Sequence, residues 1–279
     1  MSTTGNFNTG EVRYWNPPQL NTSKQIAFVK PFIAPPGLPM GLNSLDIDNC
    51  ANIRVTTYAS DIKPDSFRMH VDGWADTKIY SAGVSWLELS PGHLEYQHGQ
   101  FSTTEDHPTY KPQPKTSRRI TFARPFVTSP KVVVFLMELD MWNRSNWRVT
   151  TWAADIDQSG FTIHINSWAD TILYGATVGW IAYPNDRKFV FSGSSNTGEK
   201  RPWDHPQHKT SGTVNFGDVD FWRPPNVFLA LNSIDIGCCA NLRINATVSF
   251  VTTRDMTWHI DSWADTVLYS AGISYIAVV

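Results

Sequence analysis

The sequence predicts an all-β protein made of three tandem antiparallel β-sandwich domains. Two observations predict this class: one phrase recurs three times along the 279 residues, and apolar residues alternate with polar ones inside each copy. A period of two is the signature of a strand with one buried face. No segment shows a sustained helical period, so we expect no substantial helix.

The repeat is centred on Trp74, Trp168 and Trp263, which lie 94 and then 95 residues apart. The three copies of the phrase read HVDGWADTKIY, HINSWADTILY and HIDSWADTVLY. A unit of roughly 90 residues can enclose a small core of its own, whereas a shorter solenoid repeat needs its neighbours. No flexible linker separates the copies, so we expect them to pack together. The predicted domains are residues 1–94, 95–189 and 190–279.

Individual strands follow from the local pattern of each copy. In the second copy, Phe161, Ile163 and Ile165 alternate with polar residues and are predicted to face the core. Near-continuous apolar runs at 132–136 and 227–231 predict more deeply buried strands. Gly, Pro and Asx turns separate five or six such segments in each unit, which is typical of a small sandwich.

The composition restricts the partners and the compartment. Charged residues make up 17% of the chain and the formal net charge is -2, whereas nucleic acid or an anionic membrane would require a clustered basic field. No apolar run approaches the roughly 18 residues of a membrane span, and no signal peptide is recognisable. We therefore expect a cytoplasmic protein, or one secreted by a non-classical route. The scattered Cys50, Cys238 and Cys239 are expected to be reduced thiols.

An enzyme is not expected, because the sequence has no Gly-x-Ser-x-Gly elbow, no phosphate-binding glycine loop and no His-Glu-x-x-His. No cofactor and no metal are predicted. His70, His164 and His259 do share a strand face with the tryptophans, and around a common axis three imidazoles can bind a divalent metal. Three hydrogen-bonded histidines at the interfaces are the alternative that we favour.

Four side chains stand out in each copy. The Arg of an Asn-x-Arg strand offers a fork of donors that suits ring hydroxyls or, alternatively, the carboxylate six to eight residues upstream. A Trp and a Tyr on adjoining turns can form the apolar wall of a small-ligand site, although the Trp can also fill an interface between copies. The Asp two residues after the Trp either binds a sugar or caps its turn, and we favour the cap. These residues are Arg54, Arg148 and Arg243, Trp74, Trp168 and Trp263, Tyr80, Tyr174 and Tyr269, and Asp76, Asp170 and Asp265, with Asp46, Asp140 and Asp235 upstream.

The chain resembles the H-type lectins, the N-acetylgalactosamine-binding agglutinin domain that also occurs at the C-terminus of discoidins. The resemblance covers essentially the whole chain three times. It rests on the Phe of the first core strand, an apolar strand ending in Leu-Asp or Ile-Asp, the Asn-x-Arg strand and Phe-x5-to-6-Trp-x5-Tyr. It implies six-stranded sandwiches packed as an intramolecular pseudo-trimer, with sugar held between neighbouring copies. It also implies that the Arg, Trp and Tyr residues bind galactose-type sugars.

The resemblance also implies an acidic sugar ligand in the loop before the first core strand, and the three copies differ there. Asn16 stands at this place in copy one and Asp204 in copy three, whereas copy two has no acid in register unless Asp106 reaches it. Snail-type agglutinins place a His after the Trp, where it contacts the acetamido side of the sugar, and this chain has Ala75, Ala169 and Ala264. The three sites are therefore predicted to be unequal, with copy three the most competent and copy two the least.

We therefore expect a multivalent agglutinin that binds terminal galactose or N-acetylgalactosamine on glycans, with cell adhesion or defence as its use. The alternative is a structural or adhesive repeat protein whose sugar sites are partly or wholly lost. Binding to a glycan partner is expected for the agglutinin and not for a repeat protein that has lost its sugar sites.

Overall fold

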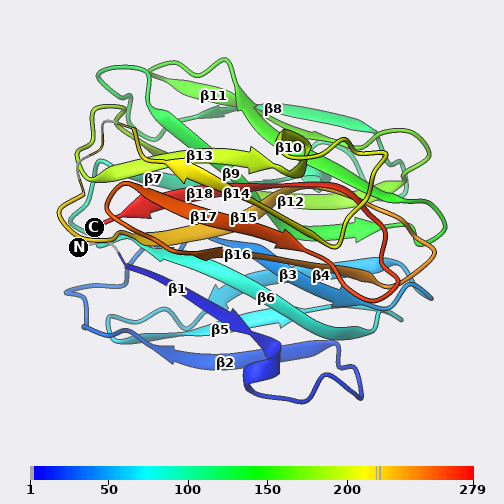
Figure 1. The fold of residues 1–279 in the computed structure, drawn as a ribbon. Helices are drawn as coiled ribbons and strands as arrows, with labels where there is room; N and C mark the ends of the chain where they lie inside the picture. Colours follow the sequence, from blue (N-terminus) through cyan, green and yellow to red (C-terminus); the bar gives the residue numbers. More distant parts are fainter. Residues whose placement is uncertain (1–2, 218, 220) are drawn as a thin grey trace.

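The computed structural model describes residues 3–217, 219 and 221–279, and these form strands joined by turns and three one-turn 3-10 helices. The predicted all-β class is confirmed. Each repeat contributes six strands and one such helix in the same order. Figure 1 labels the strands along the chain.

The first repeat contains β1 (Thr3–Asn8), η1 (Thr9–Glu11), β2 (Asn21–Ala27), β3 (Met40–Ile47), β4 (Ile53–Ser60), β5 (Ser66–Asp72) and β6 (Ile79–Glu88). The second contains β7 (Gln97–Ser102), η2 (Thr103–Glu105), β8 (Lys115–Thr121), β9 (Lys131–Met141), β10 (Trp147–Ala154), β11 (Gly160–Asn166) and β12 (Leu173–Tyr183). The third contains β13 (Val190–Asn196), η3 (Thr197–Glu199), β14 (Lys209–Asn215), β15 (Asn226–Ile236), β16 (Leu242–Ser249), β17 (Asp255–Asp261) and β18 (Leu268–Val278).

Three antiparallel sheets of six strands each are shared between repeats. Their orders are β1-β6-β3-β16-β17-β14, β13-β18-β15-β10-β11-β8 and β2-β5-β4-β9-β12-β7. Each sheet therefore takes three strands from one repeat and three from another, and the joining pairs are β3 with β16, β15 with β10 and β4 with β9. The sandwich of one repeat thus consists of halves of two different sheets.

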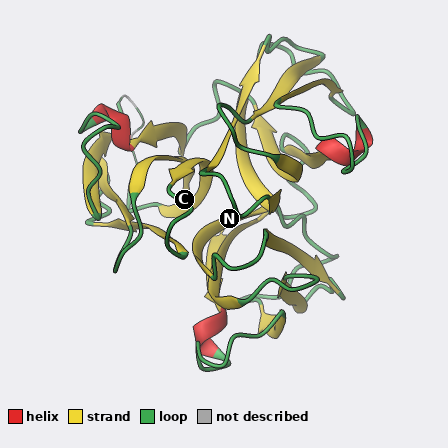
Figure 2. Ribbon diagram, turned by 90° about the vertical axis from the view of Figure 1, so that its right-hand side faces the viewer, coloured by secondary structure: helices red, strands yellow, loops and turns green. Residues whose placement is uncertain are grey.

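This sharing of sheets closes the three repeats into a ring. Repeat 1 joins repeat 3, repeat 3 joins repeat 2 and repeat 2 joins repeat 1. Figure 2 shows the result as three lobes around a common centre, with the short helices on the outer side of the lobes. The predicted intramolecular pseudo-trimer is confirmed. Backbone hydrogen bonds across each junction join the lobes into one body rather than three independent domains.

The centre of the ring is packed by residues that differ between the repeats. Strands β3, β9 and β15 contact one another there, and Gly41, Phe135 and Ala230 occupy equivalent positions on them. A Cβ atom on Gly41 would lie 2.7 Å from both Phe135 Cδ2 and Ala230 Cβ. The fully buried Phe135 ring also packs on Phe228, with centroids 4.9 Å apart. The large side chain of Phe135 therefore fills the space that the small Gly41 and Ala230 leave at the centre.

The antiparallel order decides which loops share an end of the molecule. Strands β3, β9 and β15 end where β4, β10 and β16 begin, and the turns before β6, β12 and β18 lie at that same end. The linkers between repeats and the hairpins after β4, β10 and β16 lie at the opposite end. No helix among the described residues is long and apolar enough to cross a membrane.

Candidate functional site

An arginine between two carboxylates marks each junction of the shared sheets. Nη1 of Arg148 lies 2.6 Å from Oδ1 of Asp170 in its own repeat, and Nε lies 3.3 Å from Oδ1 of Asp235 in repeat 3. The other two centres repeat the arrangement: Arg54 lies 2.6 Å from Asp76 and 3.5 Å from Asp140, and Arg243 lies 2.6 Å from Asp265 and 3.5 Å from Asp46.

These contacts correct the sequence-based pairing of Arg with the Asp upstream in its own copy. The upstream Asp of one repeat meets the Arg of another, because Arg148 and Asp235 are direct cross-strand partners where β10 joins β15. Arg54 faces Asp140 and Arg243 faces Asp46 in the same way. Each centre therefore forms only when two repeats come together.

The turn after each site tryptophan positions the second carboxylate. In repeat 2 the Thr171 amide donates to the Trp168 carbonyl at 3.2 Å, and Ala169 has a φ of 56°. Thr171 Oγ1 donates to the Asn146 carbonyl at 2.6 Å, which ties the turn to the start of β10. Asp170 is thereby aimed at Arg148, an ion pair that the sequence analysis did not predict. Ala75 and Ala264, with φ of 55° and 56°, show that the turn is the same in all three repeats.

The two carboxylates of a centre have opposite electrostatic environments. Burial raises the pKa of Asp235 above its ordinary 3.8, and the attraction of Arg148 offsets only part of this effect. The hydrogen bond from Arg148 lowers the pKa of the exposed Asp170. Asp235 Oδ1 has no well-aligned hydrogen bond among the described residues, and its 3.3 Å contact with Arg148 Nε is an ion pair. The arginine is therefore held mainly by Asp170.

Stability should respond to pH with opposite signs at these two carboxylates. A raised folded-state pKa lowers the free energy of unfolding as pH rises above 3.8, whereas a lowered pKa loses its contribution as pH falls below 3.8. We expect Asp235→Asn to gain stability relative to the wild type as pH rises from 3.8, in urea denaturation at a series of pH values. Asp170→Asn is the matched control, and its relative stability should fall as pH rises toward 3.8. Equal signs for the two variants would contradict this assignment.

A cleft of about 570 Å³ opens beside Arg148 and draws its walls from two repeats. Repeat 2 supplies Arg148 and Trp168, which is 37% exposed, and repeat 3 supplies Trp203 and Tyr269. The remaining lining residues are Asn146, Ala169, Asp235 and Ser270. The predicted wall of Trp and Tyr from one copy is therefore wrong in its pairing: the Trp of one repeat faces the Tyr of the next, because β10 continues the sheet of β15 and β18.

The other junctions contain the matching residues. Arg243 and Trp263 of repeat 3 lie at the junction with Tyr80 of repeat 1, whose hydroxyl donates to Asp48 Oδ2 at 3.1 Å. Arg54 and Trp74 of repeat 1 lie at the junction with Tyr174 of repeat 2. We name these three equivalent positions by their arginines, as the Arg148, Arg243 and Arg54 clefts, and the cavity of about 570 Å³ belongs to the first of them.

The loops that were predicted to carry an acid differ between the clefts. Exposed Asp204 follows Trp203 and lies 3.1 Å from His205 Nδ1, and Asn16 follows Trp15. Asp106, the candidate in copy two, pairs instead with Arg118 at 3.5 Å. The prediction also missed Trp15 and Trp203 themselves, whose rings pack on Tyr80 and Tyr269 with centroids 5.8 and 6.4 Å apart. A Trp inside a Pro-rich polar loop was the available signal.

The three histidines do not form a common site. His70 stacks on Tyr58 with centroids 4.4 Å apart, and His164 stacks on Trp152 at 4.7 Å. His259 Nε2 lies 2.7 Å from Ser249 Oγ. The histidines lie on β5, β11 and β17 in three different sheets, and the described residues include no group of three metal-ligating side chains.

A family model described as the H-type lectin domain matches residues 23–87, 117–183 and 211–278. The chain belongs to the H-type lectin family. One match falls in each repeat of this H-type lectin and includes its Arg, Trp and Tyr, so the family predicted from the sequence is confirmed. Membership supports carbohydrate binding in general and a non-enzymatic kind of protein.

The chain is also similar, at 31% identity or less, to individual proteins. A Fuscovulum blasticum protein named ATP synthase subunits region ORF 7 is 31% identical over 64 residues, which are 23% of this chain and 56% of that protein. The chain thus matches about half the length of that relative. Two structures of discoidin II from Dictyostelium discoideum are also similar, and each match covers 59% of this chain. The matches cover 77% and 76% of the discoidin chains, at sequence identities of 16% and 14% and TM-scores of 0.29 and 0.28. The family assignment rests on the three domain matches.

Proposed function

We propose that this H-type lectin binds terminal galactose or N-acetylgalactosamine of glycans in the clefts between its repeats. One observation carries the proposal: Arg148 lines an aromatic-walled cleft, and among the described residues no group accepts a hydrogen bond from its Nη2. Asp170 contacts Nη1 and Asp235 contacts Nε, so the Nη2 donors are available to adjacent ring hydroxyls.

The aromatic walls suit the other face of such a sugar. A pyranose has an apolar face of C–H groups, and Trp168, Trp203 and Tyr269 present ring surface in the same cleft. A volume of about 570 Å³ is in the range of small-ligand sites. A polar fork opposed to flat rings is the combination that a monosaccharide at a glycan terminus requires.

The placement of the clefts supports multivalent binding. All three arginines stand at the same end of the strands, so the clefts share one end of the ring. Several weak sites on one rigid body gain apparent affinity for clustered glycans through a raised effective concentration. Agglutination and cell adhesion follow from this arrangement. The domain boundaries predicted after residues 94 and 189 stay predictions.

A glycan array tests the proposal. We expect binding to glycans that end in galactose or N-acetylgalactosamine, none to matched glycans that end in glucose or mannose, and competition by the free sugar. The ratio of the two competing concentrations ranks galactose against N-acetylgalactosamine. Silence across all galactosides would remove the sugar-binding proposal and leave the structural or adhesive repeat protein.

A further inference from the structure

The buried Arg201 and the half-buried Arg13 lie directly behind the cleft walls, outside the clefts themselves. Arg201 is 6% exposed and follows η3. Its Nε donates to Thr210 Oγ1 at 3.1 Å, Nη1 donates to the Tyr269 carbonyl at 2.8 Å, and Nη2 donates to the Leu268 carbonyl at 2.8 Å. Arg13 makes the same contacts in repeat 1 with Thr22, Tyr80 and Ile79, at 2.7, 2.9 and 3.1 Å.

Each of these guanidinium groups connects the two segments that carry the aromatic wall. Trp203 follows Arg201 by two residues, and Tyr269 is one of the residues whose carbonyl Arg201 binds. The ring planes of Trp203 and Tyr269 meet at 58°, and those of Trp15 and Tyr80 meet at 57°. The same brace thus accompanies the same ring geometry in two repeats that differ in the intervening loop sequence.

Repeat 2 lacks both the brace and the second ring. His107 takes the place of the arginine, and its Nε2 lies 3.0 Å from Thr116 Oγ1. His107 Nδ1 is buried and has no hydrogen-bond partner among the described residues. Thr109 takes the place of the tryptophan, and Tyr110 beside it is 78% exposed. No described side chain donates to the Tyr174 carbonyl, so the Arg54 cleft is built on an unbraced wall.

We infer that Arg13 and Arg201 are positioning residues for the aromatic walls, and that the chain consequently presents two competent sugar clefts, the Arg148 and Arg243 clefts, and one incomplete Arg54 cleft. The inference rests on the proposed function. A planar fork binds two carbonyls and a hydroxyl at fixed angles, and a lysine ammonium cannot span the same three segments in that geometry. The brace therefore acts through Trp203 and Tyr269 rather than on the sugar.

The first experiment counts sites and isolates one of them. Calorimetry with methyl β-galactoside should give two sites per wild-type chain. Arg54→Lys with Arg243→Lys leaves only the Arg148 cleft, and in this background Arg201→Lys should weaken binding about tenfold or more. Arg13→Lys in the same background is the matched control, because it lies behind a different cleft, and it should leave the affinity unchanged. Equal losses in both variants, or three equal wild-type sites, would overturn the inference.

A sugar-free readout separates failure of this inference from failure of the proposed function. The Trp203–Tyr269 pair should give a near-ultraviolet circular dichroism signal that Trp203→Phe removes. Arg201→Lys should remove the same signal with little change in far-ultraviolet signal or unfolding midpoint. An intact signal in Arg201→Lys refutes the brace, whether or not any galactoside binds. Loss of the circular dichroism signal in Arg201→Lys, with no galactoside binding to the wild type, refutes the two competent sugar clefts and the proposed function. The role of Arg201 in positioning the Trp203–Tyr269 pair would still stand.

The incomplete Arg54 cleft allows a gain-of-function test. His107→Arg together with Thr109→Trp should supply repeat 2 with the brace and the ring that repeats 1 and 3 possess. We expect the number of methyl β-galactoside sites to rise from two to three in a folded double variant. A count that stays at two would show that the brace and ring do not explain the incomplete cleft.

Discussion

Arg148→Lys combined with Arg243→Lys is expected to abolish agglutination of galactose-bearing cells and to lower the affinity of each altered cleft about 10- to 100-fold. Lysine keeps the positive charge beside Asp235 and Asp46 but loses the fork that reaches adjacent hydroxyls. Hydrogen bonds to a charged group are worth about 1.5–3 kcal/mol each, and about 1.4 kcal/mol is a tenfold change in affinity. Calorimetry and cell agglutination measure the two effects.

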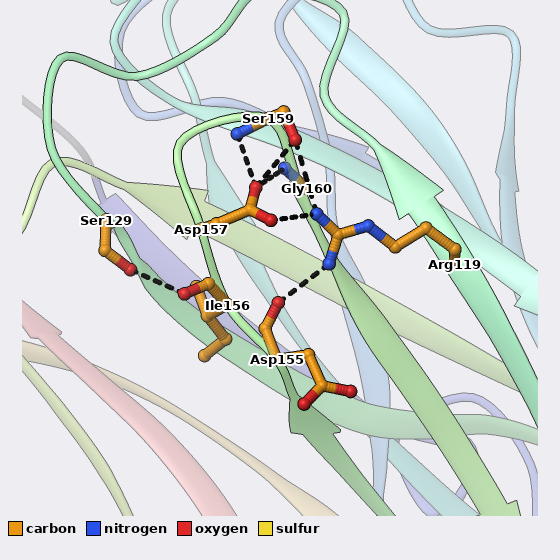
Figure 3. Close-up of polar contacts among 7 residues, drawn as sticks. All are labelled: Arg119, Ser129, Asp155, Ile156, Asp157, Ser159 and Gly160. Carbon is orange, nitrogen blue, oxygen red and sulfur yellow. Dashed lines mark hydrogen bonds and ion pairs between the residues drawn. The ribbon is translucent and has the colours of Figure 1, made fainter.

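Arg119→Lys is the matched control for this variant. Arg119 lies on β8 at the opposite end of the strands, where it donates to the Asp155 carbonyl and pairs with Asp157 (Figure 3). Both substitutions exchange an ion-paired arginine for lysine, so general effects on charge or folding should appear in both. We expect Arg119→Lys to bind galactosides as the wild type does. Unchanged binding in the double variant would remove these arginines from the site.

Phe135→Ala is expected to lower the free energy of unfolding by about 3–5 kcal/mol and the unfolding midpoint by roughly 10 °C. The Phe135 side chain is fully buried where the three repeats meet, and it packs against Phe228 and next to Gly41. Gly41 and Ala230 have no side chain that can move into the space, so a cavity remains. Scanning calorimetry measures the midpoint and the number of transitions.

The cooperativity of that unfolding tests the shared sheets. Because each sheet spans two repeats, loss of the centre should destabilise all three lobes, and Phe135→Ala should unfold in a single transition. Val127→Ala is the control, since Val127 is 92% exposed and its truncation should change stability by less than about 0.5 kcal/mol. A separate early transition of one lobe would indicate that the repeats behave as independent domains.

Local patterns were sufficient for the strands and for the identity of the main site residues. The alternation of Phe161, Ile163 and Ile165 with polar residues correctly predicted a strand with one buried face, and all three are at most 1% exposed. The Trp-Ala-Asp-Thr phrase correctly marked a turn beside Arg148. Such features depend on neighbours in the chain, so they are readable from spacing alone.

The partners across the junctions could not be predicted in this way. Asp46, Asp140 and Asp235 follow the same local pattern, so the sequence alone does not distinguish the pairing of Arg148 with Asp140 in its own copy from the pairing with Asp235 in the next. The sequence likewise gives no signal for the role of Arg201, because its acceptors are carbonyls that a sequence does not locate. These positions depend on long-range contacts.

The amino-acid sequence by itself determined that this protein has three repeats, that each is a sandwich of short strands, and that each carries one Arg and one Trp on its polar side. The tertiary structure decided that every cleft is shared by two repeats, with the Arg from one and the Tyr from another. The physical reason is the pairing of β3 with β16, β15 with β10 and β4 with β9, since backbone hydrogen bonds between strands do not depend on which repeat supplies them.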